Sequence, residues 1–357
     1  MSEDGVQRPD VVGQSPLDLV AVRAARRYPL PDSVVPTLIN ISENITYRLD
    51  DPIGGGRWAL RVHREGYHSR RAIASELSWL RALSESSAAN VPLPLRGNDG
   101  EFIQTLAVGA GMAPRNAVLF GWEQGSEPAS DDITGYERLG ETAARMHKHV
   151  KAWQRPPWFE RHTWDFATTL GDAPHWGRWR DGIGMTPAIE AAIAEAAGVI
   201  EQRLAQIGKG PEVFNLVHGD MRLANLLLDG STVKVIDFDD CGFSWFLYDC
   251  ATTVSFFEEK PEVPELIKAW VRGYRRVGVL DPIAEADIET FVMLRRILLV
   301  AWIGSHADTE LARSMGASYS EGTVPLCERY LSRFGKARQP ARTSGPIRAR
   351  WWKRLFA

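Results

Sequence analysis

A change in secondary-structure pattern near residue 125 most constrains the fold of this 357-residue chain. Short β-like runs fill the first ~125 residues, around one amphipathic helix expected at Arg70–Leu83. Beyond Ser130 the apolar spacing is helical, apart from one β-rich island at Leu216–Phe238 that turns at Asp229–Gly230. A small β lobe, a polar hinge and a larger helical lobe predict a bilobal α+β chain, and ligands favour interfaces of this kind.

The expected boundaries follow from this change of pattern. We expect a polar tail over residues 1–14, within an N-terminal lobe at 1–125. A C-terminal lobe should occupy 126–335, and a basic, aromatic tail 336–357. Such a tail suits an anionic membrane surface, although a docked or solvated tail is the simpler interpretation.

Strands and helices can be assigned within these lobes from the period of the apolar residues. Strands are expected at Val34–Asn40, Ile45–Leu49, Trp58–His63, Leu93–Arg96, Glu101–Ala107 and Ala117–Trp122. Helices are expected at Leu17–Arg27, Tyr136–His149, Ala188–Ile207, Glu265–Val277 and Ala284–Ile303.

Composition excludes several classes of protein. A net charge of -3 leaves no basic field for nucleic acid, so we expect no nucleic-acid partner. Three cysteines without a CxxC pair argue against a zinc site or a disulfide framework. The longest apolar run, Ile297–Gly304, is too short to span a bilayer, and the polar start resembles no signal peptide. We therefore expect a cytoplasmic protein.

The stretch Leu216–Asp249 carries the chemistry. Asp220 leads a loop, Asn225 precedes one strand of the expected hairpin, and Asp237 ends the other strand. Antiparallel pairing would bring Asn225 and Asp237 together, and oxygen ligands of this kind suit Mg²⁺. Asp220 would remain on the adjoining loop, able to accept a proton from an attacking hydroxyl.

These residues resemble a known family. Residues 218–225 read HGDMRLAN and 236–240 read IDFDD, a pair of motifs similar to the aminoglycoside phosphotransferase/choline kinase superfamily. The group of type II homoserine kinases and stress-response kinases is most similar, over roughly residues 34–335. The resemblance implies a protein-kinase-like fold, ATP and Mg²⁺ as cofactors, and transfer of the γ-phosphate to a hydroxyl.

The resemblance also implies roles for individual residues. Asp220 would be the catalytic base, with Asn225 and Asp237 holding Mg²⁺ against the phosphates. Three neighbours would support them: His218 braces the loop, Arg222 steadies the γ-phosphate and Asp249 supports the loop from the protein interior.

In the N-terminal lobe, a kinase-like fold requires a cation on the third strand and a glutamate on the following helix. Arg61 and Glu76, fifteen residues apart, fit these positions. An arginine replaces the lysine of protein kinases, and its planar fork also suits phosphate. The usual glycine-rich loop is missing, so Ser42 and Asn44 would have to face the phosphates with the loop backbone.

The hinge is expected at Phe120–Gly125, where adenine would bond to the backbone. Phe120 and Trp122 could flank the base, and the sequence does not distinguish them.

The acceptor is expected to be small, since twelve residues from Asp237 to Asp249 leave no peptide-seating segment. An amino alcohol or hydroxy amino acid could lie against Trp176 and Trp179 and near the acidic Asp239 and Asp240. Tryptophan packing and a solvated acidic turn are equally good interpretations. Homoserine, hydroxylysine, choline-like alcohols and aminoglycosides all fit.

Two other functions stay open from the sequence. One is a stress-response-type Ser/Thr protein kinase, since the superfamily includes such enzymes. The other is a non-catalytic nucleotide-binding regulator, which ranks low because no metal ligand or base is missing. The oligomeric state is not readable.

Overall fold

The computed structural model describes residues 16–41, 44–109 and 111–335. Its N-terminal lobe is built on a five-stranded antiparallel sheet in the order β1-β2-β3-β5-β4. The strands are β1 (Val35–Ile41), β2 (Ile45–Asp50), β3 (Arg57–Val62), β4 (Ile103–Leu106) and β5 (Arg115–Gly121).

Two helices cover opposite faces of this sheet. Successive residues of a strand point to opposite faces, and Leu119 of β5 packs in one core cluster with α1 (Pro16–Ala25). Val118 packs in the other cluster with α2 (Arg70–Glu85). Because Arg61 of β3 lies directly opposite Val118, it faces α2.

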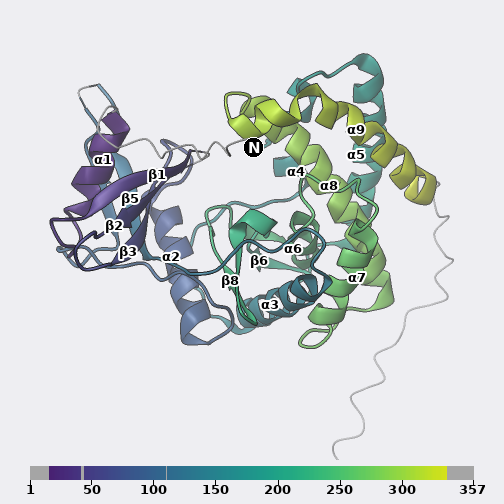
Figure 1. Ribbon diagram of the computed structural model, residues 1–357. Helices are drawn as coiled ribbons and strands as arrows, with labels where there is room; N and C mark the ends of the chain where they lie inside the picture. The colour runs from purple at the N-terminus through teal and green to yellow at the C-terminus, as the bar shows by residue number, and fades with distance from the viewer. Residues whose placement is uncertain (1–15, 42–43, 110, 336–357) are drawn as a thin grey trace, which may run out of the picture.

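The C-terminal lobe is mostly helical and contains two short β-pairs (Figure 1). Its helices are α3 (Ile133–Ala152), α4 (Phe166–Thr169), α5 (Pro187–Ile207), α6 (Phe246–Thr252), α7 (Val263–Tyr274), α8 (Pro282–Ser305) and α9 (Glu310–Phe334). The pairs join β6 (Phe214–Val217) to β9 (Gly242–Trp245) and β7 (Leu226–Asp229) to β8 (Thr232–Val235). The α+β, bilobal architecture expected from the sequence is confirmed.

One predicted strand is wrong. Leu93–Arg96 forms an isolated bridge to β5 rather than a strand. Pro92 and Pro94 have no backbone N–H, so the segment makes two backbone hydrogen bonds to β5, one donated by Leu95 and one accepted by Leu93. Strand β9 and helices α6 and α9 are elements that the sequence patterns did not single out.

Helices α3 and α7 cross in close contact in the C-terminal lobe. A Cβ at Gly140 of α3 would lie 1.9 Å from the Trp270 carbonyl oxygen of α7, so a larger residue cannot fit there. In the described part of the chain, no helix has the length and apolar character needed to cross a bilayer. The basic tail at 336–357 lies outside the described residues.

Candidate active site

A buried carboxylate shapes the loop that carries Asp220. Asp249 of α6 accepts hydrogen bonds from the backbone N–H groups of His218, at 3.2 Å, and Gly219, at 2.8 Å. The Nε2 atom of His147 lies 2.9 Å from the same carboxylate. Asp249 therefore replaces the hydrogen bonds that a regular element would give this loop.

Gly219 is a position that the loop geometry restricts to glycine. Its φ is +83°, in the left-handed region, and an added Cβ would lie 2.8 Å from the Asp240 carbonyl oxygen. The HGD motif thus lets the loop pass close to the segment that follows β8.

Both carboxylate oxygens of Asp220 accept hydrogen bonds. Its Oδ2 accepts a hydrogen bond from Asn225 Nδ2 at 2.8 Å and another from Arg222 Nε at 3.2 Å. Its Oδ1 accepts one from Arg295 Nη2 on α8. Burial alone would raise the pKa of Asp220, but Arg295, Arg222 and His218 outweigh it and hold the pKa below its usual value. The carboxylate is therefore ionised at neutral pH.

The β7–β8 hairpin brings Asn225 and Asp237 together. The Asn225 carbonyl accepts a hydrogen bond from Ile236 N at 2.9 Å, immediately before Asp237. Because Asn225 Nδ2 is committed to Asp220, its Oδ1 is the atom left for a cation. The Asp237 side chain stays 48% exposed, in a left-handed conformation with φ 58°, and Arg61 Nη1 lies 3.7 Å away.

The environment of Asp237 disfavours its negative charge. Burial of about half of the side chain raises its pKa, and the carboxylates of Asp239, Glu76 and Asp220 raise it further, against the opposing effect of Arg61. A divalent cation at this point would relieve that repulsion. Among the described residues no three His, Cys, Asp or Glu side chains cluster as a complete metal site. A metal held by Asn225 and Asp237 would thus need phosphate or water oxygens as well.

Arg61 forms the ion pair that the sequence predicted, with an additional partner. Its guanidinium lies 2.5 Å from Glu76 Oε1 and 3.1 Å from Asp239 Oδ1, and all three residues are buried. Burial opposes ionisation of Asp239, but the rings of His63 and His68 and the guanidinium of Arg61 hold its pKa well below the usual value.

The two adjacent aspartates considered for the acceptor have different environments. Asp239 is committed to Arg61 and is 4% exposed, so the structure does not offer it to an acceptor. Asp240 is half-buried, and its Oδ1 accepts a hydrogen bond from Tyr67 at 2.6 Å. Burial raises the pKa of Tyr67 well above its usual value, so its hydroxyl stays a donor.

The two tryptophans predicted together also separate. Trp179 is 2% exposed and packs in the core of the C-terminal lobe, where its ring contacts Arg180. Trp176 donates from Nε1 to the Tyr67 hydroxyl at 3.0 Å, and Arg295 lies over its ring, 5.1 Å from the centroid. Both tryptophans are buried in one core cluster, but Trp176 contacts Tyr67 and Arg295, which in turn bond Asp240 and Asp220.

The residues expected to face the nucleotide have contacts within the protein that can be described one by one. Ser42 lies outside the described residues, and the side chain of Asn44 accepts a hydrogen bond from the Arg64 backbone N–H at 3.1 Å, inside its own loop. Phe120 is buried under Arg61, at 5.0 Å from its ring centroid, and Trp122 is half-buried.

Arg295 and Tyr67 are site residues that the sequence analysis missed, and only Arg295 left a signal in the sequence. Arg295 lies in α8. It belongs to a helix whose apolar run was noted for its length alone, directly after Arg295 and Arg296. Two adjacent arginines inside the otherwise apolar stretch Phe291–Gly304 were the available signal, since a buried charge requires a partner.

Comparisons with known proteins agree with this geometry. Residues 38–285 match the model of the phosphotransferase enzyme family. The solved structure of a microcompartment-associated aminopropanol kinase is 40% identical, with a TM-score of 0.82, and the match covers 89% of this chain and 98% of that one.

Two further similarities concern amicoumacin kinases. The Bacillus subtilis (strain 168) enzyme is 24% identical over 297 residues, which are 78% of this chain and 82% of the relative. A solved amicoumacin kinase in complex with AMP-PNP, Ca²⁺ and Ami is 23% identical, with a TM-score of 0.70, over 88% of this chain and 93% of that one. The chain therefore belongs to the phosphotransferase enzyme family and is a kinase-like phosphotransferase, as the resemblance of its motifs predicted.

Proposed function

We propose that this enzyme transfers the γ-phosphate of ATP to the hydroxyl of a small amino alcohol, with Mg²⁺ as cofactor. The observation that carries the proposal is the ionised carboxylate of Asp220, fixed on its loop beside Asn225. A base in this state can take the proton of an alcohol while the oxygen attacks phosphorus.

The phosphate side of the site is provided by four residues. Asn225 and Asp237 would hold Mg²⁺, which when bound neutralises charge on the phosphate oxygens. Arg61 presents a guanidinium that Glu76 orients, and Arg222 is a second cation beside Asp220. These groups bind and orient the triphosphate, and catalysis then depends on positioning more than on covalent chemistry.

A small acceptor is favoured over a peptide. In the twelve residues from Asp237 to Asp249, the chain forms β9, pairs it with β6 and enters α6 directly. No free segment remains there to seat a polypeptide or to carry a regulatory phosphate.

An amine on the acceptor is favoured by the charge beside Asp220. Asp240 contributes a carboxylate and the half-buried Tyr67 contributes aromatic surface, and the buried Trp176 holds Tyr67 through its hydroxyl. An ammonium group would be stabilised by both kinds of surface. The 40% identity to an aminopropanol kinase supports the same acceptor class.

The test is an ADP-release assay of the purified protein with MgATP and a panel of acceptors. The panel holds aminopropanol, ethanolamine, choline, homoserine, hydroxylysine and aminoglycosides. We expect the highest kcat/KM with a short amino alcohol. Turnover of aminoglycosides alone, or of no acceptor, would contradict the proposal.

Asp220→Ala is the matched variant for this assay. It should lower turnover by about 100-fold or more and leave ATP binding, measured by calorimetry, within about twofold, because Asp220 is proposed to take the acceptor proton and not to hold the nucleotide. Retained turnover would refute the assigned role of Asp220.

A further inference from the structure

Arg295 is a buried arginine whose bonding is organised around the proposed base. It lies on α8 and is 1% exposed, in a helix whose other residues are mostly apolar. Each of its guanidinium nitrogens has a partner. Nη2 donates to Asp220 Oδ1, Nη1 to the Tyr248 hydroxyl at 3.2 Å, and Nε to Ser255 Oγ at 3.0 Å.

The contacts that restrain the arginine come from several parts of the C-terminal lobe. Tyr248 lies on α6, Ser255 lies just beyond the end of α6, and the Trp176 ring lies 5.1 Å from the guanidinium carbon. A guanidinium is a planar fork, so partners on three nitrogens fix its orientation and not just its position. The group that it holds toward the site is Asp220.

The hydrogen bonds to Asp220 indicate where the acceptor proton goes. A carboxylate offers about four lone-pair positions, two on each oxygen. Asn225 and Arg222 take both positions on Oδ2, and Arg295 takes one on Oδ1. The remaining position is therefore on Oδ1, the oxygen that Arg295 holds.

We propose that Arg295 is a positioning residue that fixes the Asp220 carboxylate so that Oδ1 faces the acceptor hydroxyl. The inference rests on the proposed function, because it defines Oδ1 relative to the acceptor. In the step, the acceptor O–H bond breaks and its proton moves to Oδ1 while the acceptor oxygen bonds to the γ-phosphorus. The bond from that phosphorus to the bridging oxygen breaks, and ADP leaves with the electron pair.

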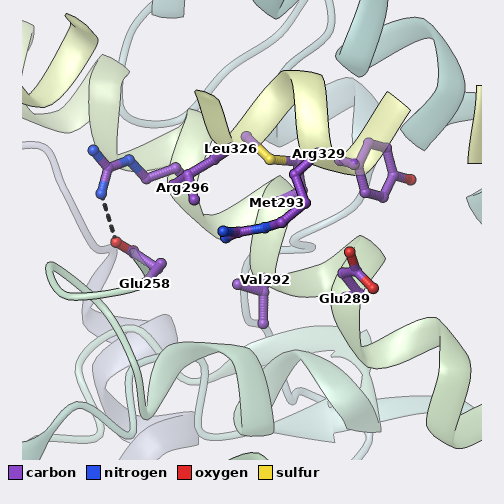
Figure 2. A pocket seen from close by; sticks show the side chains of 8 residues that line it. Glu258, Glu289, Val292, Met293, Arg296, Leu326 and Arg329 are labelled. Carbon is purple, nitrogen blue, oxygen red and sulfur yellow. Dashed lines mark hydrogen bonds and ion pairs between the residues drawn. The ribbon is translucent and has the colours of Figure 1, made fainter. Parts of the chain in front are cut away.

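The adjacent Arg296 provides a matched control. It is also a buried arginine of α8, but its partners are Glu258, in the segment between α6 and α7, at 2.8 Å, and Thr323 of α9 at 2.9 Å. Figure 2 shows this ion pair beside a small cavity between α8 and α9. Arg296 is thus a buried arginine of the same helix whose hydrogen bonds do not include Asp220.

The experiment compares Arg295→Gln, Arg295→Lys and Arg296→Lys in the full-length enzyme, with the acceptor that gives the highest wild-type turnover. A misplaced base costs about 100-fold in rate, so we expect Arg295→Gln to lower kcat by roughly that factor. The KM values for ATP and acceptor should stay within about twofold. Arg295→Lys keeps the charge without the fork, and we expect it to recover part of the loss. Arg296→Lys should lower the melting temperature and leave kcat near wild type.

A second comparison separates positioning from a general structural effect. In an Asp220→Ala background, Arg295→Lys should change the residual single-turnover rate by less than about twofold, because residues that act as a unit are not additive. The inference is overturned if kcat of Arg295→Lys equals that of the wild type, or if the Asp220→Ala background shows the full loss. If Arg295→Gln does not fold, these two results with Arg295→Lys decide. Absence of wild-type turnover would instead refute the proposed function itself.

Discussion

Arg61 of β3 and Asp239, which follows β8, form a buried ion pair across the two lobes, with 3.1 Å between Nη1 and Oδ1. Glu76 of α2 holds the other arm of the same guanidinium. This relationship fixes Arg61, the cation proposed for the nucleotide side, relative to Asp237, two residues before Asp239, and therefore couples the N-terminal lobe to the candidate metal site.

Replacing Arg61 with lysine tests this coupling. A lysine keeps the charge but cannot bond Glu76 and Asp239 in one plane. A hydrogen bond between charged groups contributes about 1.5–3 kcal/mol, so kcat/KM for ATP should fall at least about tenfold. Arg48→Lys on the neighbouring strand β2, where the arginine pairs with Asp50, is the control and should leave kinetics unchanged. Equal kinetics for the two variants would contradict a role for Arg61.

Replacing Asp237 with asparagine tests the proposed metal site. The variant removes the negative charge that would bind the cation, so we expect half-maximal activity to require at least about tenfold more Mg²⁺. Activity is measured against free Mg²⁺ at constant ATP. Asp229→Asn, on the exposed side of the same hairpin, should leave the Mg²⁺ dependence unchanged. An unaltered Mg²⁺ requirement in Asp237→Asn would place the metal elsewhere.

Replacing Asp249 with asparagine tests the support of the loop. One amide oxygen must replace two acceptor oxygens, and the NH₂ group would face the backbone N–H of His218 or Gly219. We expect the free energy of unfolding, measured by urea denaturation, to fall by about 3 kcal/mol. Asp281→Asn, at the N-cap of α8, should change it by less than about 0.5 kcal/mol because asparagine caps equally well. Comparable stability of the two variants would show that Asp249 is dispensable for folding.

The buried His68 predicts a pH dependence of stability. Burial lowers its pKa from 6.5 to about 3 in the folded protein. Below pH 6.5 the unfolded chain binds a proton that the folded chain does not, so the free energy of unfolding decreases as the pH falls toward 3. The slope from one such histidine is at most about 1.4 kcal/mol per pH unit. Above pH 6.5 the residue contributes nothing to this dependence.

Urea denaturation between pH 6.5 and 5 measures this slope, since ordinary carboxylates remain ionised there. His68→Gln should give a shallower slope than the wild type. Part of the slope should persist, because burial also lowers the pKa of His162, to about 4. Parallel slopes for the wild type and His68→Gln would show that His68 is protonated in the folded state.

The sequence predicted most of the fold because periodicity and turn chemistry are local properties. The hairpin at Asp229–Gly230 and the helix that carries Glu76 follow from short-range patterns. The Leu93–Arg96 strand failed where two prolines removed the N–H groups that a ladder needs. Long-range partners were beyond this reasoning, because the contact of Arg295 with Asp220 joins residues 75 positions apart.

The tryptophans at 176 and 179 show the same limit, and they supply a last prediction. The sequence does not distinguish them, and both are buried in one core cluster, yet Trp176 contacts Tyr67 and Arg295 while Trp179 carries Arg180 over its ring. Trp179→Ala should leave a cavity and lower the free energy of unfolding by about 3–5 kcal/mol, with little change in the acceptor KM of the remaining folded enzyme. Trp176→Phe keeps an aromatic ring but removes the N–H that holds Tyr67.

We expect Trp176→Phe to raise the acceptor KM several-fold, with the KM for ATP unchanged, because Tyr67 in turn orients Asp240. Steady-state kinetics with a short amino alcohol measure both constants, and urea denaturation measures stability. Tyr67→Phe removes the other end of the same hydrogen bond, so it should reproduce the KM effect, and the double variant should add little to either. A higher acceptor KM in Trp179→Ala than in Trp176→Phe would indicate that the acceptor binds near Trp179 and not near Asp240.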